Sequence, residues 1–326
     1  MSEACVPNSI LVVGSLNADI IVEIDRLPKR GETIAARSDK TGFMVPGGKG
    51  ANQATAVAKA SSPKSSFAQL ATVFGNDGHA RALSVSLEKN NVDTKLCLEA
   101  DVPSGQAIIF LEKGGENSII IIGGANNSWP DKLPTKLVTA IQSAATVLLQ
   151  QEIPDRINLA VAKCAKETKV PVMMDVGGEE RELSDELLSS VSLVSLNETE
   201  LARLTGGMKT DTKGQCIDAA KLLLEKGCKE ILVTLGKDGA ILISPKGQIE
   251  QEVLEVDKEK IVDTTGAGDC FRGAFAVARA EGKDDKAALR FAAAAASLCI
   301  QVKGAQPSMP TREAILDVAG LKASSI

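Results

Sequence analysis

Short apolar runs that alternate with stretches of helical periodicity constrain the fold of this chain more than any other feature of its sequence. The apolar runs lie at residues 10–14, 146–149, 170–174, 193–196 and 231–235. Helical patterns separate most of them and are clear at residues 156–167 and 216–226. Strands that alternate with helices form βαβ units and a mostly parallel sheet covered on both faces. We therefore expect an α/β fold with a three-layer αβα domain.

Two segments interrupt this alternation. Residues 18–46 contain an apolar run but no helical pattern. Residues 105–122 predict a β-hairpin, with strands at 106–112 and 117–122 and a turn at Gly114-Gly115. Antiparallel strands inserted into a parallel α/β chain predict a small β-sheet lid over one end of the main sheet. The expected boundaries are 1–16, 49–104 and 124–326 for the core, and 17–48 and 105–123 for the lid.

The composition of the 326 residues is that of a globular protein, with 44% hydrophobic and 24% charged residues. A net charge of −5 and the lack of a Lys/Arg run argue against a nucleic-acid partner. The longest apolar run, near residues 291–300, is far shorter than the roughly 20 residues of a membrane span. Seven cysteines without a CxxC pair predict reduced thiols, no zinc site and a cytoplasmic location. The one histidine, His79, lies in a turn and is expected to be solvated.

The strongest chemical signal is the segment DTTGAGD at residues 263–269. It follows residues 260–262, expected to be a short strand, and precedes a helical pattern at 270–280. A glycine-rich turn at a helix N-terminus gathers N–H groups that attract an anion, such as a phosphoryl group in transfer. Asp269 could accept the proton of an attacking hydroxyl. The alternative is that Asp269 only favours the helix N-terminus and the glycines only turn the chain.

A second glycine-rich segment, GGKGANQA at residues 47–54, also precedes a helical pattern. It is not a P-loop, because Phe43 stands in place of the first glycine and Gly50 follows Lys49. Bare glycines allow the close approach of a small polar ligand, to which Lys49 and Asn52 would donate hydrogen bonds. A helix cap with tight packing is the alternative interpretation.

Two further segments follow predicted strands at the carboxyl edge of the sheet. Asn197 and Glu200 have the spacing of a capping box. At this edge they would also be placed to contact nucleotide phosphate and a hydrated Mg²⁺. Thr234 lies in a glycine-containing segment that fits a β-hairpin, and its hydroxyl would point into the same crevice.

The order of these segments resembles that of the ribokinase family of sugar and nucleoside kinases. The resemblance runs from GSLNAD at 14–19 to KGAQPS at 303–308, and the segments at 47–54 and 263–269 match the two signatures of the family. It implies a ribokinase-like core with a β-lid. It also implies transfer of the γ-phosphoryl group of ATP to the primary 5-hydroxyl of D-ribose, giving D-ribose 5-phosphate and ADP. The implied cofactors are Mg²⁺ and an activating K⁺.

The resemblance also implies roles for individual residues. The catalytic base would be Asp269, with an anion hole at Gly266, Ala267 and Gly268 and the amide of Asp269. The sugar contacts would be Asn17, Asp19, Gly47, Gly48, Lys49, Asn52, Glu152 and Asp269. The ATP contacts would be Asn197, Thr234, Gly236, Gly239 and Gly268. Glu200 would hold Mg²⁺ through water, and K⁺ would lie among Asp263, Thr265, Cys299, Val302, Gly304 and Ser308.

Three positions depart from the family pattern. The segment DVGG at residues 175–178 stands where many members have NPAP, and Ala293 stands where a histidine near adenine is common. Arg272 stands where asparagine or a small residue is usual. The first two departures leave the contacts to the adenine base open but do not affect the phosphoryl chemistry.

Two other functions remain open at this stage. One is a kinase of the same family that acts on a hexose, a nucleoside or deoxyribose, although GGKGANQA and KGAQPS favour a sugar kinase. The other is a sugar-binding protein without turnover, against which the retained Asp269 argues.

The run of four isoleucines at residues 119–122 is apolar on both faces of its predicted strand. One face should therefore meet another surface. The lid of a second copy is one candidate for that surface, so we expect a homodimer formed through the lid.

Overall fold

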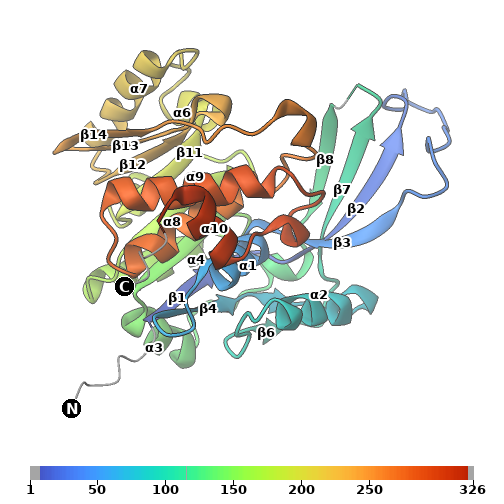
Figure 1. The fold of residues 1–326 in the computed structure, drawn as a ribbon. Helices are drawn as coiled ribbons and strands as arrows, with labels where there is room; N and C mark the ends of the chain where they lie inside the picture. Colours follow the sequence, from blue (N-terminus) through green and yellow to red (C-terminus); the bar gives the residue numbers. More distant parts are fainter. Residues whose placement is uncertain (1–7, 115, 322–326) are drawn as a thin grey trace.

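The computed structural model describes residues 8–114 and 116–321 (Figure 1). The order of strands in the main sheet is β14 (Gly247–Gln251), β13 (Ala240–Ser244), β12 (Ile231–Thr234), β11 (Leu193–Asn197), β10 (Val172–Gly178), β9 (Thr146–Gln151), β1 (Asn8–Val13) and β4 (Ser66–Ala71). Strands β12 to β4 in this order are parallel, and β13 and β14 pair antiparallel at one edge. All five apolar runs that predicted strands lie in this sheet.

Helices cover both faces of the main sheet. One face carries α1 (Lys49–Ala60), α2 (Gly78–Lys89), α8 (Ala267–Ala280), α9 (Asp285–Cys299) and α10 (Arg312–Ala319). The opposite face carries α3 (Thr135–Ser143), α4 (Asp155–Glu167), α5 (Asp185–Leu188), α6 (Glu198–Leu204) and α7 (Lys213–Glu225). The prediction of a three-layer αβα arrangement is confirmed.

Alternation along the strands divides the hydrophobic core into two halves. Leu148 of β9 packs in the cluster that contains Phe275 of α8, whereas its neighbours Val147 and Leu149 pack with Val161 of α4. Successive side chains of a strand point to opposite faces, so an unbroken apolar run can fill both halves. Each fully buried side chain of this size contributes about 1.5–3 kcal/mol to folding before the loss of entropy is counted.

A second sheet projects from one end of the main sheet (Figure 1). Its strands follow the order β3 (Phe43–Gly47), β2 (Asn17–Ile24), β7 (Gly105–Glu112) and β8 (Asn117–Ile122). β2 and β7 are parallel, and the two outer pairs are antiparallel. The strands of the predicted hairpin are confirmed, and Gly115 of its expected turn lies outside the described residues. A short parallel pair, β5 (Val73–Phe74) with β6 (Leu98–Glu99), completes the strands.

The short strand predicted at residues 260–262 is wrong. A 3₁₀ turn covers Lys258–Lys260, and the side chains of Ile261 and Val262 are exposed. The N–H groups of Val262 and Asp263 both donate to the carbonyl of Ile300, at 2.9 and 3.2 Å. Their hydrogen-bonding partner is therefore the end of α9 rather than a neighbouring strand, and this contact anchors the loop that leads to α8.

The described cysteines and the histidine take no part in a disulfide or a metal cluster. Six cysteines are free thiols, and Cys5 lies outside the described residues. His79 is half-buried in the first turn of α2, where Asp77 caps the helix by accepting hydrogen bonds from the N–H groups of His79 and Ala80. Within residues 8–114 and 116–321, no group of three His, Cys, Asp or Glu side chains is arranged to hold a metal ion.

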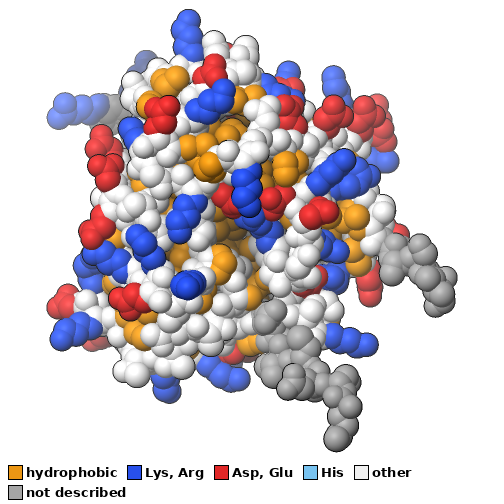
Figure 2. Space-filling view, turned by 90° about the vertical axis from the view of Figure 1, so that its left-hand side faces the viewer, with side chains coloured by type: hydrophobic (Ala, Val, Ile, Leu, Met, Phe, Trp, Pro, Cys, Tyr) orange, Lys and Arg blue, Asp and Glu red, His pale blue; other side chains and the backbone are white. Residues whose placement is uncertain are grey.

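The surface carries charges of both signs. Figure 2 shows Lys and Arg side chains interspersed with Asp and Glu over one face of the molecule, with smaller hydrophobic areas between them. No helix in the described part of the chain is both long enough and apolar enough to cross a bilayer.

Candidate active site

The candidate active site lies at the carboxyl ends of the parallel strands, beside the second sheet (Figure 1). Glu152 follows β9, Asn197 ends β11 and Thr234 ends β12. The chain passes from β1 of the main sheet to β2 of the second sheet at residues 14–17, and from β3 of the second sheet back to the core at α1 at residues 47–49. Gly48 packs against the backbone of Leu16 and Asn17, so these two crossings lie side by side. Ligands of open α/β sheets bind at the carboxyl ends of the strands.

Asp269 is the centre of a buried polar network. It lies in the first turn of α8 and is 5% exposed. Its Oδ1 accepts a hydrogen bond from Gln53 Nε2 and its Oδ2 one from Asn52 Nδ2, each at 3.1 Å. Gln53 Nε2 also donates to Asp175 Oδ2, and Gln53 Oε1 accepts from Gln150 Nε2. A carboxylate can accept about four hydrogen bonds, so Asp269 is held in place and retains capacity for a substrate hydroxyl.

The ammonium group of Lys49 lies between two carboxylates. Its Nζ is 3.7 Å from Asp175 Oδ2 and 4.0 Å from Asp269 Oδ1. Burial opposes the charge on this group, but the negative charges of Asp175 and Asp269 outweigh it and raise the pKa of Lys49 above its ordinary value. Lys49 is therefore a cation at neutral pH, and its side chain remains one-quarter exposed to the cleft.

Two more carboxylates lie where the sheets join. Burial, followed by the nearby charges of Glu152 and Asp269, raises the pKa of Asp19 to about 7. Asp19 Oδ1 is buried and has no hydrogen-bond partner among the residues that the structure describes. Glu152 Oε2 accepts hydrogen bonds from Ser15 Oγ at 2.6 Å and from the Lys49 N–H at 3.0 Å. Burial raises the pKa of Glu152 even though the charge of Lys49 acts in the opposite direction.

Asn17 is held by a residue that the sequence did not single out. Its Oδ1 accepts a hydrogen bond from Asn126 Nδ2 at 2.6 Å, and Asn126 Oδ1 accepts one from the Leu16 N–H at 2.9 Å. Asn126 lies in the 3₁₀ turn Gly124–Asn127 after β8. It thus fixes the first crossing between the sheets.

The turn before α8 presents free N–H groups at the helix N-terminus. Gly266 has φ 78°, a left-handed conformation that favours glycine. The N–H of Ala267 donates to the Thr264 carbonyl at 3.2 Å, whereas those of Gly268 and Asp269 have no acceptor among the described residues. With the positive end of the helix dipole, these two free amides give the turn a positive potential that favours an anion.

Asn197 and Glu200 form a reciprocal capping box at the start of α6. Asn197 Oδ1 accepts from the Glu200 N–H, and Glu200 Oε2 accepts from the Asn197 N–H, both at 2.9 Å. The capping alternative offered by the sequence is therefore confirmed. Glu200 Oε1 makes no hydrogen bond within the described residues, and it lies 3.0 Å from the position of a Cβ built on Gly177. One carboxylate oxygen is thus left for a ligand.

The predicted ATP contacts farther along the edge lie in the turn between β12 and β13. Thr234 Oγ1 donates to the Leu196 carbonyl at 3.3 Å. A side chain at Gly236 would meet no atom within 4 Å, so this part of the turn borders open space. Gly239 ends the turn and packs against the carbonyl of Gln251. The predicted hairpin is confirmed.

The residues predicted to surround K⁺ lie in two loops tied together by Asp263. Its Oδ1 accepts from the Thr265 N–H at 2.9 Å and its Oδ2 from the Gly304 N–H at 2.8 Å. Cys299 Sγ lies 3.0 Å from Ser308 Oγ. Within the described residues, three carbonyls here accept no backbone hydrogen bond: those of Thr265, Val302 and Gly304. Such oxygens are the ligands that proteins offer to K⁺.

Two of the residues that depart from the family pattern, Asp175 and Arg272, form an ion pair. Arg272 Nη2 is 3.2 Å from Asp175 Oδ1, and both side chains are almost completely buried. Ala293, the third departure, is buried in α9 within the hydrophobic core. The sequence identified Asp175 and Arg272 separately but gave no signal that they form an ion pair.

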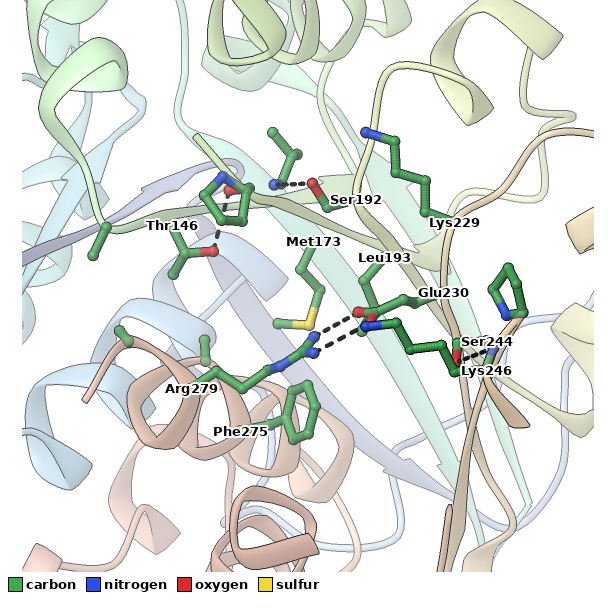
Figure 3. Close-up of a pocket in the computed structure, with 16 residues that line it drawn as sticks. Thr146, Met173, Ser192, Leu193, Lys229, Glu230, Ser244, Lys246, Phe275 and Arg279 are labelled. Carbon is green, nitrogen blue, oxygen red and sulfur yellow. Dashed lines mark hydrogen bonds and ion pairs between the residues drawn. The ribbon is translucent and has the colours of Figure 1, made fainter. Parts of the chain in front are cut away.

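A cavity of about 560 Å³ lies away from these residues (Figure 3). It opens at the amino ends of β9, β10 and β11 and contains none of the residues predicted for the site. Met173, Leu193 and Phe275 line it, and Arg279 points across it to Glu230, with which it forms an ion pair of 2.6 Å. It has no free carboxylate beside an anion site and is not the candidate active site.

A mostly parallel sheet, free amides at a helix N-terminus and a buried carboxylate in the same turn are the features expected of a small-molecule kinase of the α/β class. Comparison with known proteins agrees with this class. The family model of pfkB family carbohydrate kinases matches residues 7–312. The chain belongs to this family.

Named relatives match almost the whole chain. It is 47% identical to a ribokinase of Arabidopsis thaliana over 94% of this chain and 80% of the relative, and 36% identical to a ribokinase of Bacillus subtilis over 94% and 98%. The solved structure of Arabidopsis thaliana ribokinase complexed with ribose and ATP superimposes with a TM-score of 0.89 at 45% identity, covering 98% of this chain and 100% of that one.

Proposed function

We propose that this enzyme transfers the γ-phosphoryl group of ATP to the 5-hydroxyl of D-ribose, giving D-ribose 5-phosphate and ADP. The observation that carries the proposal is a pair of buried acceptor oxygens close to Asp269, Asp19 Oδ1 and Asn52 Oδ1, which have no partner in the described part of the chain. An unpaired buried acceptor is costly, and sugar hydroxyls would satisfy both. The Arabidopsis thaliana relative whose structure contains ribose and ATP supports ribose as the sugar.

In the proposed reaction, the 5-hydroxyl of ribose lies against Asp269, whose carboxylate accepts its proton. A bond forms between the sugar oxygen and the γ-phosphorus, while the bond from this phosphorus to the β,γ-bridging oxygen breaks and ADP leaves with the electron pair. The amides of Gly268 and Asp269 and the ammonium group of Lys49 would stabilise the negative charge of the group in transfer.

Sugar recognition would involve the residues at the two crossings between the sheets. We assign the contacts to Asn17, Asp19, Gly47, Gly48, Lys49, Asn52 and Glu152. One carboxylate or amide group can form hydrogen bonds with two neighbouring hydroxyls of a sugar at the same time. A site built in this way disfavours analogues that lack a hydroxyl, because its own buried groups are then unpaired.

We assign the nucleotide and ion contacts to the rest of the edge. ATP would contact Asn197, Thr234, Gly236, Gly239 and Gly268. The free Oε1 of Glu200 fits water-mediated binding of Mg²⁺, which when bound would neutralise phosphate charge. The K⁺ site would be formed by the Asp263 carboxylate, the carbonyls of Thr265, Val302 and Gly304, and groups of Cys299 and Ser308. By holding the two loops together, these residues would keep the anion site in shape.

The test measures the formation of ADP when the enzyme is given ATP, Mg²⁺ and D-ribose, once in a K⁺ buffer and once in a Na⁺ buffer. We expect turnover that depends on ribose and is faster in K⁺. Turnover with another sugar or a nucleoside, but not with ribose, would overturn the substrate assignment and leave the phosphoryl chemistry in place. Sugar binding without turnover on any acceptor would favour a binding protein instead.

We propose that the second sheet, with boundaries at residues 17–48 and 105–123, closes over the site as a lid. The core would comprise residues 1–16, 49–104 and 124–326. Closure would exclude water, which competes with the sugar for the phosphoryl group. The free thiols of the six described cysteines fit a reducing, cytoplasmic location, which we also propose.

A homodimer formed through β8 is expected. Ile119, Ile120, Ile121 and Ile122 are all exposed, and β8 is an edge strand of the second sheet. Alternate residues point to opposite faces, so both faces are apolar.

Analytical ultracentrifugation should give a dimer for the wild type and a monomer for Ile120→Lys. The control Val253→Lys, at a similarly exposed position outside β8, should remain a dimer. A monomeric wild type would contradict the proposal.

A further inference from the structure

Arg272 is a buried cation with one end of its guanidinium group left unpaired. It lies in α8, one turn after Gly268, and is 4% exposed. Its Nε donates to Ser195 Oγ at 2.8 Å, and its Nη2 is 3.2 Å from Asp175 Oδ1 and 3.9 Å from Glu200 Oε2. Its Nη1 donates no hydrogen bond to any residue that the structure describes. The side chain is thus fixed on one side and available on the other.

The available end of Arg272 lies against the first turn of α8. A Cβ built on Gly268 would be 2.6 Å from Nη1, so the guanidinium group occupies the space of a side chain at that position. The free amides of Gly268 and Asp269 belong to the same turn. A cation at the positive end of a helix is unfavourable. An anion bound there would interact favourably with both the helix N-terminus and the guanidinium group.

The nearby carboxylates do not engage the Nη1 end of Arg272. Asp175 is shared, because Lys49 Nζ lies 3.7 Å from its Oδ2 and Gln53 Nε2 donates to the same oxygen. Glu200 Oε2 is committed to the Asn197 N–H of the capping box. Two cations, Lys49 and Arg272, therefore flank the free amides. The Nη1 donor of Arg272 has no partner among the described residues, and a bound phosphoryl group would supply an acceptor for it.

We propose that Arg272 Nη1 contacts the γ-phosphoryl group of the bound nucleoside triphosphate and so adds a charged donor to the amides of Gly268 and Asp269. The inference rests on the kinase function proposed above and deepens it. Arginine suits this role because its planar group makes several contacts at once in fixed directions. Asp175 holds Nη2 and thereby aims Nη1, which makes Asp175 a positioning residue for this contact.

A purely structural role for Arg272 predicts a different result in a double-mutant cycle. The cycle compares the wild type, Arg272→Gln, Asp175→Asn and the double variant. If Arg272 contacts phosphate, Arg272→Gln lowers kcat by about 10²-fold, and the double variant stays as slow. If Arg272 only neutralises Asp175, removing both charges restores kcat to within about threefold of the wild type, which would overturn the proposal. Arg272→Gln alone leaves the buried Asp175 carboxylate without its arginine and could fail to fold. The double variant removes both charges, so it can still be measured in that case.

A binding measurement without sugar locates the contact on the nucleotide. Titration calorimetry compares ADP with the β,γ-imido analogue of ATP, each with Mg²⁺, on the wild type and on the double variant. We expect the affinity for the triphosphate analogue to fall about tenfold more than that for ADP. Equal losses for the two nucleotides would exclude a γ-phosphoryl contact. Because no sugar is present, this readout does not depend on whether ribose is the acceptor, so the two proposals can fail separately.

Discussion

Replacing Asp269 by asparagine is expected to lower kcat for ribose phosphorylation by about 10²- to 10⁴-fold, because an amide cannot accept the proton of the attacking hydroxyl. The fold should tolerate the change. Asp269 accepts hydrogen bonds from the amides of Asn52 and Gln53, and a new NH₂ group would face one of these donors. Asn52 Oδ1 is buried and has no partner within residues 8–114 and 116–321, so a rotation of the Asn52 amide would turn this oxygen toward the new donor.

Steady-state kinetics and a thermal unfolding curve check this expectation together. Asp284→Asn is the matched control, because Asp284 caps α9 by accepting from the Ala287 N–H at 2.8 Å and asparagine caps a helix equally well. The control should keep both its kcat and its melting temperature. An Asp269→Asn protein that melts like the wild type and retains more than about a tenth of its kcat would rule out Asp269 as the base.

Replacing Asp19 by asparagine is expected to stabilise the ligand-free protein by an amount that grows with pH. Below about pH 4 this aspartate is protonated in both the folded and the unfolded chain. Between pH 4 and pH 7 the unfolded chain releases the proton while the folded chain retains it, because the pKa of the folded group is about 7. The stability of the wild type therefore falls as the pH rises through this window, by at most about 4 kcal/mol in total. Asparagine carries no such penalty.

Urea unfolding at pH 5.5 and pH 8.5, without ligands, measures this effect. The stability advantage of Asp19→Asn should be about 2 kcal/mol larger at pH 8.5. Asp131→Asn, at a fully exposed position, should show no such change. The Asp19 variant should also bind ribose more weakly, because it loses a carboxylate acceptor for the hydroxyls. An advantage that is equal at the two pH values would contradict the raised pKa of Asp19.

The fold could be predicted from the sequence because the inner strands of the parallel sheet are buried on both faces. Such a strand appears as an unbroken apolar run, and Leu148 with its neighbours shows why every residue of the run is needed. The edge strand β4, with Phe67 exposed, shows no such run. The strand predicted at residues 260–262 is wrong, because only Ile261 and Val262 are apolar there and both are exposed. Apolar character alone does not provide a neighbouring strand, and Val262 instead pairs with the end of α9.

The residues of the site could be predicted only where a local pattern existed. Asp269 and Lys49 lie in glycine-rich segments whose spacing is visible in the chain. Asn126 lies in an ordinary turn, and its role appears only when the fold brings it to Asn17. The contact of Asp175 with Arg272 likewise joins a strand end to a distant helix, so no spacing could indicate it.

The two crossings between the sheets have a consequence for how such an enzyme can diversify. The segments at 14–17 and 47–49 are both the supports of the second sheet and the expected sugar ligands. An inserted residue at 14–17 would turn every following side chain of β2 to the other face and remove Asp19 from the site. The loop between Ile24 of β2 and Phe43 of β3 lies at the far end, where length changes leave the register untouched. Insertions and deletions among homologous enzymes should therefore accumulate in the loop between Ile24 and Phe43, while the segments at 14–17 and 47–49 keep their length.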